Sequence, residues 1–354
     1  GNARDPRYQT EKYFAGHWIY RKATTIIRDV PAESGTTVIQ VQDASDFRVK
    51  TGRYKTSNDD IALFGISGEG KHNWDHCEQV QLLQVDTDRN TITVKRGCYG
   101  TKPRRFVAGE ARAAAHRVEG PWGRTNNLMW FYNYATHCPR DREGKTCSDR
   151  LVDDLSPWFG HDGVLAAFDG LEFDVLHHQT RGDTDGDGKE DHGVVNGRNE
   201  YGIGVVEFAN QLRARMTDNF IIQADGALGP GGAASQRAFG IFNGIESEGF
   251  PNLGDGEFDD WSGGLNRHFF WRDNARRPVF NYVNHKWNQA VPGEPGMRMQ
   301  PEIPFSRHRL SFAACQFFDA MTCYSFAPAD DPAGVIGIWD EFRRGVDNKL
   351  GWLG

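Results

Sequence analysis

The stretch FDGLEFDVL at residues 168–176 carries the pattern from which the fold of this chain can be predicted. Side chains of an extended strand alternate between its two faces. Leu171 and Phe173 therefore share one face, which is apolar and suited to packing beneath helices. Glu172 and Asp174 share the other face. The stretch predicts a strand with one buried face and one acidic face.

Two later segments repeat this arrangement of polar side chains near the end of a short strand. In IIQAD, Gln223 and Asp225 share a face, and in GIESE, Glu246 and Glu248 do. A glycine or a loop follows each segment. Three strands with matching polar ends predict that carboxylates gather at one edge of a sheet.

Strand patterns alternate with helical patterns along most of the chain. The eight strand candidates lie near Trp18 and over residues 129–134, 168–176, 220–225, 241–248, 279–285, 323–326 and 335–339. Repeated β–α units favour a parallel sheet, and eight of them predict an α/β protein with a (β/α)8 barrel. A doubly wound open sheet is the alternative, but no glycine-rich dinucleotide motif follows the first strand. One helix is expected to begin at Ser148, whose hydroxyl can cap its free amides.

The segment from residue 30 to residue 118 has a different pattern. Its alternating β patterns at 36–41, 79–85 and 91–95 are separated by turns, and it has no helical period. We therefore expect a small all-β domain inserted after the first barrel strand. The expected domains are 1–29 (N-terminal segment and first strand), 30–118 (inserted module) and 119–354 (the rest of the barrel).

Acidic residues at the strand ends are the candidates for catalysis. The catalytic set is Asp174, Asp225, Glu246 and Glu248. Gathered carboxylates repel one another unless they share a proton, a cation or a substrate. Because the chain has no Ser or Cys nucleophile motif, the paired carboxylates favour glycoside hydrolysis. We expect Asp174 or Asp225 to be the nucleophile or base and Glu248 the acid. Glu246, with Glu172, is expected to bind sugar hydroxyls, and the choice between retention and inversion stays open.

Three further side chains are candidates for binding the substrate. Gln223 shares a strand face with a catalytic candidate, and His285 stands at the end of its strand. Trp130 offers a flat apolar ring of the kind on which sugars stack, although core packing is the ordinary role of such a residue. With Glu172, these residues form the expected sugar-binding set.

The loop DTDGDGKED at residues 183–191 is the most specific local motif. Oxygen-bearing side chains at alternate positions, with glycine at the sixth, are typical of a calcium-binding loop. The expected ligands are Asp183, Asp185, Asp187 and Asp191, with the carbonyl of Lys189 between them. Position twelve is Val194 in place of the bidentate Glu of a helical EF-hand. We therefore expect a structural Ca²⁺ without EF-hand helices.

Composition narrows the range of partners and compartments. A net charge of −7 and a pI of about 6.0 give no electrostatic reason to expect nucleic acid. No apolar run is long enough to span a bilayer. Cys138 and Cys147 flank a charged loop and could form a disulfide, as could Cys77 and Cys98, although reduced thiols are the alternative. We expect a secreted or periplasmic protein that acts on a carbohydrate, of unspecified oligomeric state.

The strand-end motifs DGLEFD, IQADG and GIESE resemble those of glycoside hydrolases with amylase-like or endo-polygalactosaminidase-like barrels, over residues 120–340. This resemblance implies a barrel that acts on polysaccharide. An amylase-type enzyme would have a His-Asp pair where this chain has His285-Lys286. Residues 78–116 resemble small β modules of secreted and phage-associated proteins.

Two other functions stay open at the level of sequence. One is a non-catalytic carbohydrate-binding or surface protein on a degenerate barrel. The other is a metal-dependent hydrolase or phosphodiesterase that uses the acidic cluster as its metal site. Few histidines accompany the carboxylates, which counts against zinc or iron.

Overall fold

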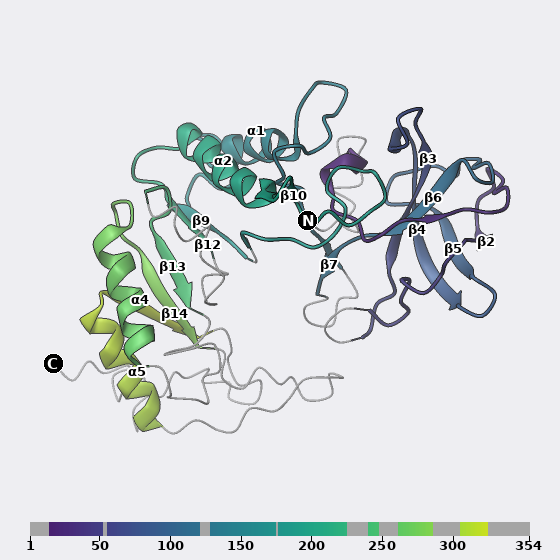
Figure 1. Cartoon of the computed structure of the whole chain (residues 1–354). Coiled ribbons are helices and arrows are strands. Elements are labelled where there is room, and N and C mark those ends of the chain that lie inside the picture. Colours follow the sequence, from purple (N-terminus) through teal and green to yellow (C-terminus); the bar gives the residue numbers. More distant parts are fainter. Residues whose placement is uncertain are drawn as a thin grey trace. The chain divides into compact units, whose positions relative to one another are not determined.

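The computed structural model describes residues 14–51, 55–120, 128–174, 176–224, 240–247, 261–285 and 305–324 (Figure 1). Contacts divide the chain into two compact units. The first comprises Gly1–Leu155 and His178–Gln211, and the second comprises Ser156–His177 and Leu212–Gly354. Both units are therefore discontinuous in sequence, and the first contains the β-rich module together with the acidic loop.

The first unit is built on a six-stranded antiparallel sheet in the order β1-β6-β3-β4-β5-β2. The strands are β1 (Thr24–Thr25), β2 (Thr36–Gln40), β3 (Asp60–Ile66), β4 (His72–Asp86), β5 (Thr91–Cys98) and β6 (Ala111–Ala115). The turn predicted between β4 and β5 is present, and Asn90 has the positive φ of 51° that such a turn favours. The alternating patterns expected at 36–41, 79–85 and 91–95 thus form strands.

Both faces of this antiparallel sheet are covered. On β3, Ile61 and Leu63 point into one apolar cluster, while Ala62 and Phe64 belong to a second. The second cluster is completed by Trp18, Tyr20, Ala114 and Trp130. Most of β3 is consequently buried on both sides.

The second unit holds a five-stranded parallel sheet in the order β15-β14-β13-β12-β9. Its strands are β9 (Gly170–Phe173), β12 (Ile221–Ala224), β13 (Gly244–Ser247), β14 (Asn281–His285) and β15 (Ala320–Tyr324). The four α-helices of the described chain are α1 (Cys147–Trp158), α2 (Glu200–Arg215), α4 (Trp261–Asn274) and α5 (Phe305–Phe317). The shorter elements are a 3₁₀ helix (Ala15–His17), β7 (Val118–Glu119), β8 (Met129–Trp130), β10 (Val194–Val195) and β11 (Arg198–Asn199).

The expected (β/α)8 barrel is wrong, and so is the resemblance to barrel glycoside hydrolases that implied it. The described chain contains five parallel strands and a separate antiparallel sheet. The first two expected barrel strands pair in antiparallel fashion: Trp18 bridges Tyr132, which lies in the second of them, and β8 pairs antiparallel with β7. The physical reason is that the aromatic side chains of Trp18 and Trp130 are buried against the antiparallel sheet. The eighth expected strand, 335–339, lies outside the described residues.

Helix α1 begins one residue earlier than expected and has a different cap. Thr146 Oγ1 accepts a hydrogen bond from the Asp149 amide at 3.3 Å, and the Asp149 carboxylate accepts one from the Thr146 amide at 2.9 Å. This reciprocal pair is a capping box with Thr146 as the N-cap. Ser148 lies within the first turn, so the predicted Ser148 cap is wrong.

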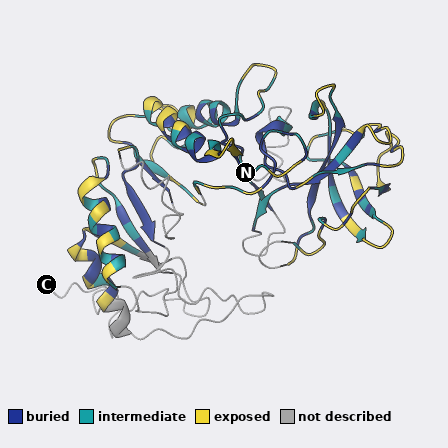
Figure 2. Cartoon of the chain, in the orientation of Figure 1, coloured by how far each residue is buried: buried dark blue, intermediate teal, exposed yellow. Residues whose placement is uncertain are grey.

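The parallel sheet has one apolar face and one polar face. Val283 of β14 packs with Ala314, Cys315 and Phe318 from α5 and the turn after it. Figure 1 shows α4 and α5 along this face, and Figure 2 shows that exposed residues recur along α4 and along the coloured part of α5. Because side chains alternate, the other face carries Glu172, Gln223, Glu246 and Tyr282.

Candidate functional site

The acidic loop at residues 183–191 is anchored to the antiparallel unit by backbone hydrogen bonds. The Asp183 amide donates to the Tyr20 carbonyl at 2.7 Å, and the Ala23 amide donates to the Gly188 carbonyl at 3.0 Å. The amide of His72, the first residue of β4, donates to the Gly186 carbonyl at 2.7 Å. The loop is therefore held at positions 183, 186 and 188 by distant parts of the sequence.

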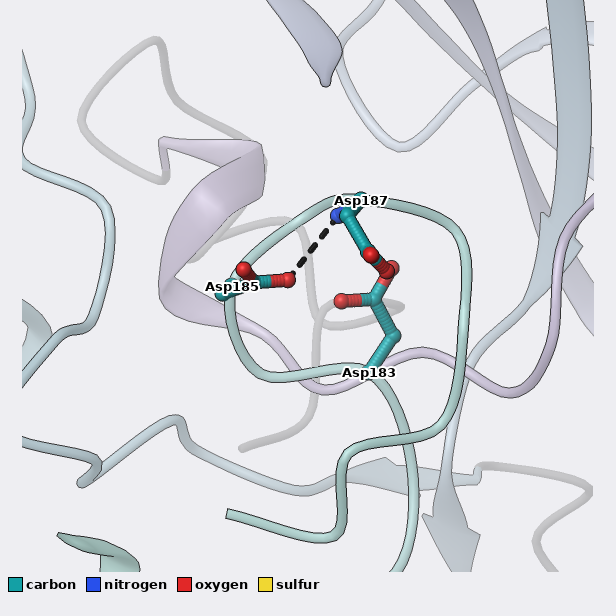
Figure 3. Close-up of side chains that lie close together, drawn as sticks. All are labelled: Asp183, Asp185 and Asp187. Atoms are coloured by element: carbon teal, nitrogen blue, oxygen red, sulfur yellow. Dashed lines mark hydrogen bonds between the residues drawn. The ribbon is translucent and has the colours of Figure 1, made fainter. Parts of the chain in front are cut away.

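Three carboxylates meet inside this loop. Asp183, Asp185 and Asp187 each offer an oxygen, and these oxygens all lie within 4.8 Å of one another. Figure 3 shows the three side chains directed into the ring that the loop forms. The spacing of two residues that predicted this grouping places the carboxylates together. Oxygen donors of this kind suit a hard divalent cation such as Ca²⁺.

Two glycines give the loop its shape. Gly186 and Gly188 have φ angles of +77° and +86°, which favour glycine. Their amides each donate to the Asp183 carboxylate at 2.7 Å. A Cβ on Gly186 would also lie 2.4 Å from the Trp74 ring. Conformation and space therefore both require glycine at position 186.

The loop gathers carboxylates in a partly buried environment. Burial raises the pKa of Asp183 to about 7, with further upward contributions from Asp185 and Asp191, while the two glycine amides oppose the rise. For Asp185, burial also raises the pKa, but hydrogen bonds from Lys71 and from the Asp187 amide outweigh it, so the pKa is lowered. A cation at this position would relieve the repulsion.

The other two expected ligands have different surroundings. Asp191 accepts hydrogen bonds from the hydroxyl of Thr184 at 2.6 Å and from the Gly193 amide at 2.6 Å, and it is not part of the three-carboxylate group. The Lys189 amide donates to Asp187 at 2.7 Å, and its ammonium lies 3.4 Å from the same carboxylate. The structure thus brings together three of the five residues expected to ligate the metal.

The polar face of the parallel sheet brings residues of four strands together. In the register, Gln223 lies opposite Glu172, and Glu246 lies opposite Tyr282. The Tyr282 hydroxyl on β14 donates a hydrogen bond to the Glu172 carboxylate on β9. Three inter-strand spacings separate these strands, or about 14 Å on a flat sheet. A direct contact over that span indicates that the sheet curls, with its polar face on the inside.

The end of β13 is fixed from the opposite face. Ser247 follows Glu246 and points toward α4, where its hydroxyl lies 2.9 Å from His268 Nε2. Burial lowers the pKa of His268 to about 3, so the imidazole stays neutral. The neutral ring also stacks on Phe318 at a centroid distance of 4.3 Å. These contacts help to keep the neighbouring Glu246 side chain on the polar face.

The remaining expected site residues have varied positions. Asp174 is exposed directly after β9, whereas Asp225 and Glu248 lie outside the described residues. His285 is the last residue of β14. The Gln223 side-chain amide donates to the carbonyl of Phe280, so this group is engaged within the sheet.

Trp130 belongs to the first unit, whereas the parallel sheet belongs to the second. Its ring is 3 % exposed, and its indole N–H donates to Asp60 at 2.9 Å. The His116 imidazole stacks on it at a centroid distance of 3.5 Å. In this structure the ring belongs to the core of the antiparallel unit.

The expected disulfides are not formed in the structure. Cys77, Cys98, Cys138 and Cys147 are free thiols. Burial raises the pKa of the Cys138 thiol to about 12. The expectation of an oxidising compartment therefore rests on composition alone.

Sequence reasoning missed two side chains that touch the candidate residues. The position of Tyr282 could have been predicted from the sequence, because it shares a strand face with Asn284 and its strand follows that of Glu246 in the chain. The position of Lys71 could not have been, because it meets Asp185 from a turn more than a hundred positions away in the sequence. Long-range contacts of this kind leave no local pattern.

Among the helices in the described ranges, none combines the length and the apolar character needed to cross a membrane. No protein-family model matches the chain, and no curated protein matches it. Among solved structures, a pyruvate kinase from Cryptosporidium parvum aligns with a TM-score of 0.25 and 7 % identity. That alignment covers 86 % of this chain and 50 % of the pyruvate kinase chain, so this chain spans half of it. A score this low carries no argument about fold or function.

Proposed function

We propose that this chain is a glycoside hydrolase whose carboxylates act on the concave polar face of the parallel sheet. The observation that supports it is that Glu172 and Glu246 share this face close to the carboxyl ends of their strands. The Tyr282 hydroxyl, on the same face, donates a hydrogen bond to Glu172. In sheets of parallel strands, ligands bind outside the carboxyl ends. The proposal needs no closed barrel.

The chemistry requires two carboxyl groups in different protonation states. One gives a proton to the leaving oxygen, and the other, ionised, attacks the anomeric carbon or activates water. Asp174 or Asp225 is the proposed nucleophile or base and Glu248 the proposed acid. Glu172, Glu246, Gln223 and His285 are proposed to orient sugar hydroxyls. A secreted or periplasmic location, where polysaccharide is met, is part of this proposal.

The test is sugar release from a panel of polysaccharides and oligosaccharides, measured as new reducing ends. Turnover of at least one glycan by the calcium-loaded chain is the expected result. Binding without turnover would overturn the hydrolase and favour a non-catalytic carbohydrate-binding protein. Activity that requires an added transition metal would favour the metal-dependent hydrolase instead.

We also propose that the acidic loop binds one structural Ca²⁺ through Asp183, Asp185 and Asp187. The donor set fits, because three carboxylate oxygens converge and the glycines at 186 and 188 keep the ring open. Asp191 and the Lys189 carbonyl are the remaining proposed ligands. The cation would neutralise the charge of the carboxylates and hold the loop in one conformation.

Chelation is expected to destabilise the calcium-loaded chain, because a ligand that binds only the native state stabilises it by RT ln(1 + [L]/Kd). At a calcium concentration of 100 Kd this amounts to about 2.7 kcal/mol, which is several degrees in the melting temperature. Differential scanning fluorimetry with Ca²⁺ and with a chelator measures it. The Asp183→Asn variant, which weakens the site, should respond little. An equal melting temperature with and without chelator in the native chain would argue against the site.

A further inference from the structure

The acidic loop already has a cation of its own. The Lys71 ammonium lies 3.0 Å from Asp185 Oδ2 and 3.4 Å from the Asp185 carbonyl oxygen. The other carboxylate oxygen, Asp185 Oδ1, accepts the Asp187 amide at 3.1 Å. Both oxygens of this proposed ligand are therefore occupied by donors from the protein.

The position of Lys71 is fixed by the backbone on both sides of it. The Lys71 carbonyl accepts a hydrogen bond from the Ser67 amide at 2.8 Å, which closes the turn before β4. The amide of the next residue, His72, donates to Gly186 inside the loop at 2.7 Å. Arg112 then joins the turn to the loop, since its guanidinium donates to the carbonyls of Gly70 at 2.9 Å and Asp187 at 2.8 Å. This ion pair is therefore part of a built contact between turn and loop.

We propose that Lys71 is a resident counter-cation, which a divalent ion must displace from Asp185 in order to bind. The inference rests on the proposed calcium site and concerns its regulation. With the metal absent, the ammonium offsets part of the repulsion among the three carboxylates. With the metal present, the ammonium and Ca²⁺ repel each other across a few ångströms. Lys71 therefore weakens calcium binding while it stabilises the metal-free loop.

A lysine outside the acidic loop provides the control. An exposed charge far from the metal is screened by water and salt, so such a lysine should not compete with the metal. Lys95 on β5 controls for the change in net charge alone, because β5 lies between β4 and β2 and makes no pairing with the loop.

The test is calorimetric titration of the chelator-treated full chain with CaCl₂ at low salt. Two variants are compared with the native chain: Lys71→Met and Lys95→Met. The Lys71→Met variant should lower the Kd for Ca²⁺ about tenfold, since removing one charge near a doubly charged ion is worth on the order of tenfold. The Lys95→Met variant should change the Kd less than about threefold. The metal-free Lys71→Met chain should also melt at a lower temperature than the metal-free native chain.

The outcomes separate this inference from the calcium site itself. If the native chain and Lys71→Met bind Ca²⁺ with equal Kd, the counter-cation role is overturned and the site stands. If only Lys71→Met binds, the role of Lys71 is upheld. If neither binds, both proposals fall. Melting curves of all three chains show whether each variant is folded.

Discussion

Replacing Glu78 with alanine is expected to lower the free energy of unfolding of the antiparallel unit by about 3–5 kcal/mol. The Glu78 and Arg96 side chains are 0 % exposed and form a two-point ion pair, with nitrogen–oxygen distances of 2.7 and 2.6 Å. Glu78 also accepts the amides of Gly97 at 2.9 Å and Arg104 at 2.8 Å. The variant would leave a buried guanidinium without its partner carboxylate and two amides without acceptors.

An exposed pair in the same unit is the matched control for Glu78. Arg142 contacts Asp75 at 3.0 and 2.8 Å, also through two nitrogens, but these side chains are 83 % and 69 % exposed. Asp75→Ala should therefore cost less than about 1 kcal/mol. Urea denaturation of both variants measures the difference. Equal losses would show that burial of the Glu78 pair does not matter to stability.

Neutralising the proposed catalytic carboxylates is expected to lower the rate of sugar release by about 10²–10⁴-fold. The variants are Asp174→Asn, Asp225→Asn and Glu248→Gln, each of which keeps the shape of the side chain and removes its charge. Asp174 is exposed, so its replacement should leave the melting temperature nearly unchanged. The measurement is kcat on the glycan that the native chain hydrolyses.

Asp162→Asn is the control for these variants. The Asp162 side chain belongs to the same unit as Asp174, is 96 % exposed, and its ion pair is with the adjacent His161. Its replacement should leave kcat unchanged. Full activity in all three catalytic variants would rule out the assignment, whereas a loss in Asp162→Asn would show that charge at a distance governs the rate.

Local patterns in the sequence predicted the parallel strands well, because a strand's alternation depends on its own residues. Strands expected at 168–176, 220–225 and 241–248 appear as β9, β12 and β13 with Glu172 and Glu246 on one face. The prediction of a barrel was wrong because the partner of each strand is decided by contacts between segments that are far apart in the sequence. The aromatic runs around Trp18 and at 129–134 have strand character, and they bury their rings on the antiparallel sheet.

The candidate sites show the same division between local and distant contacts. The grouping of Asp183, Asp185 and Asp187 follows from spacing within one loop, so the sequence predicted it. The hydrogen bond from the Thr184 hydroxyl to the Asp191 carboxylate is also within the loop. The sequence did not predict it, because several hydroxyl and carboxylate groups in one loop can pair in many ways. The strand face of Tyr282 can be predicted from the alternation of its strand, but its contact with Glu172 joins distant segments, as does the contact of Lys71 with Asp185.

The anchoring of the acidic loop on Tyr20, Ala23 and His72 has a consequence for biosynthesis. These partners are made early, but the first unit is completed only when residues 178–211 have left the ribosome. By then β9 has been made as well, and it must wait for β12 before it can pair. Translation proceeds at about 5–20 residues per second and domains generally fold as units, so the first unit waits seconds for its acidic loop and the second waits seconds for the later strands of its sheet. A truncation at residue 155 would therefore release a β-sheet that lacks its closing loop.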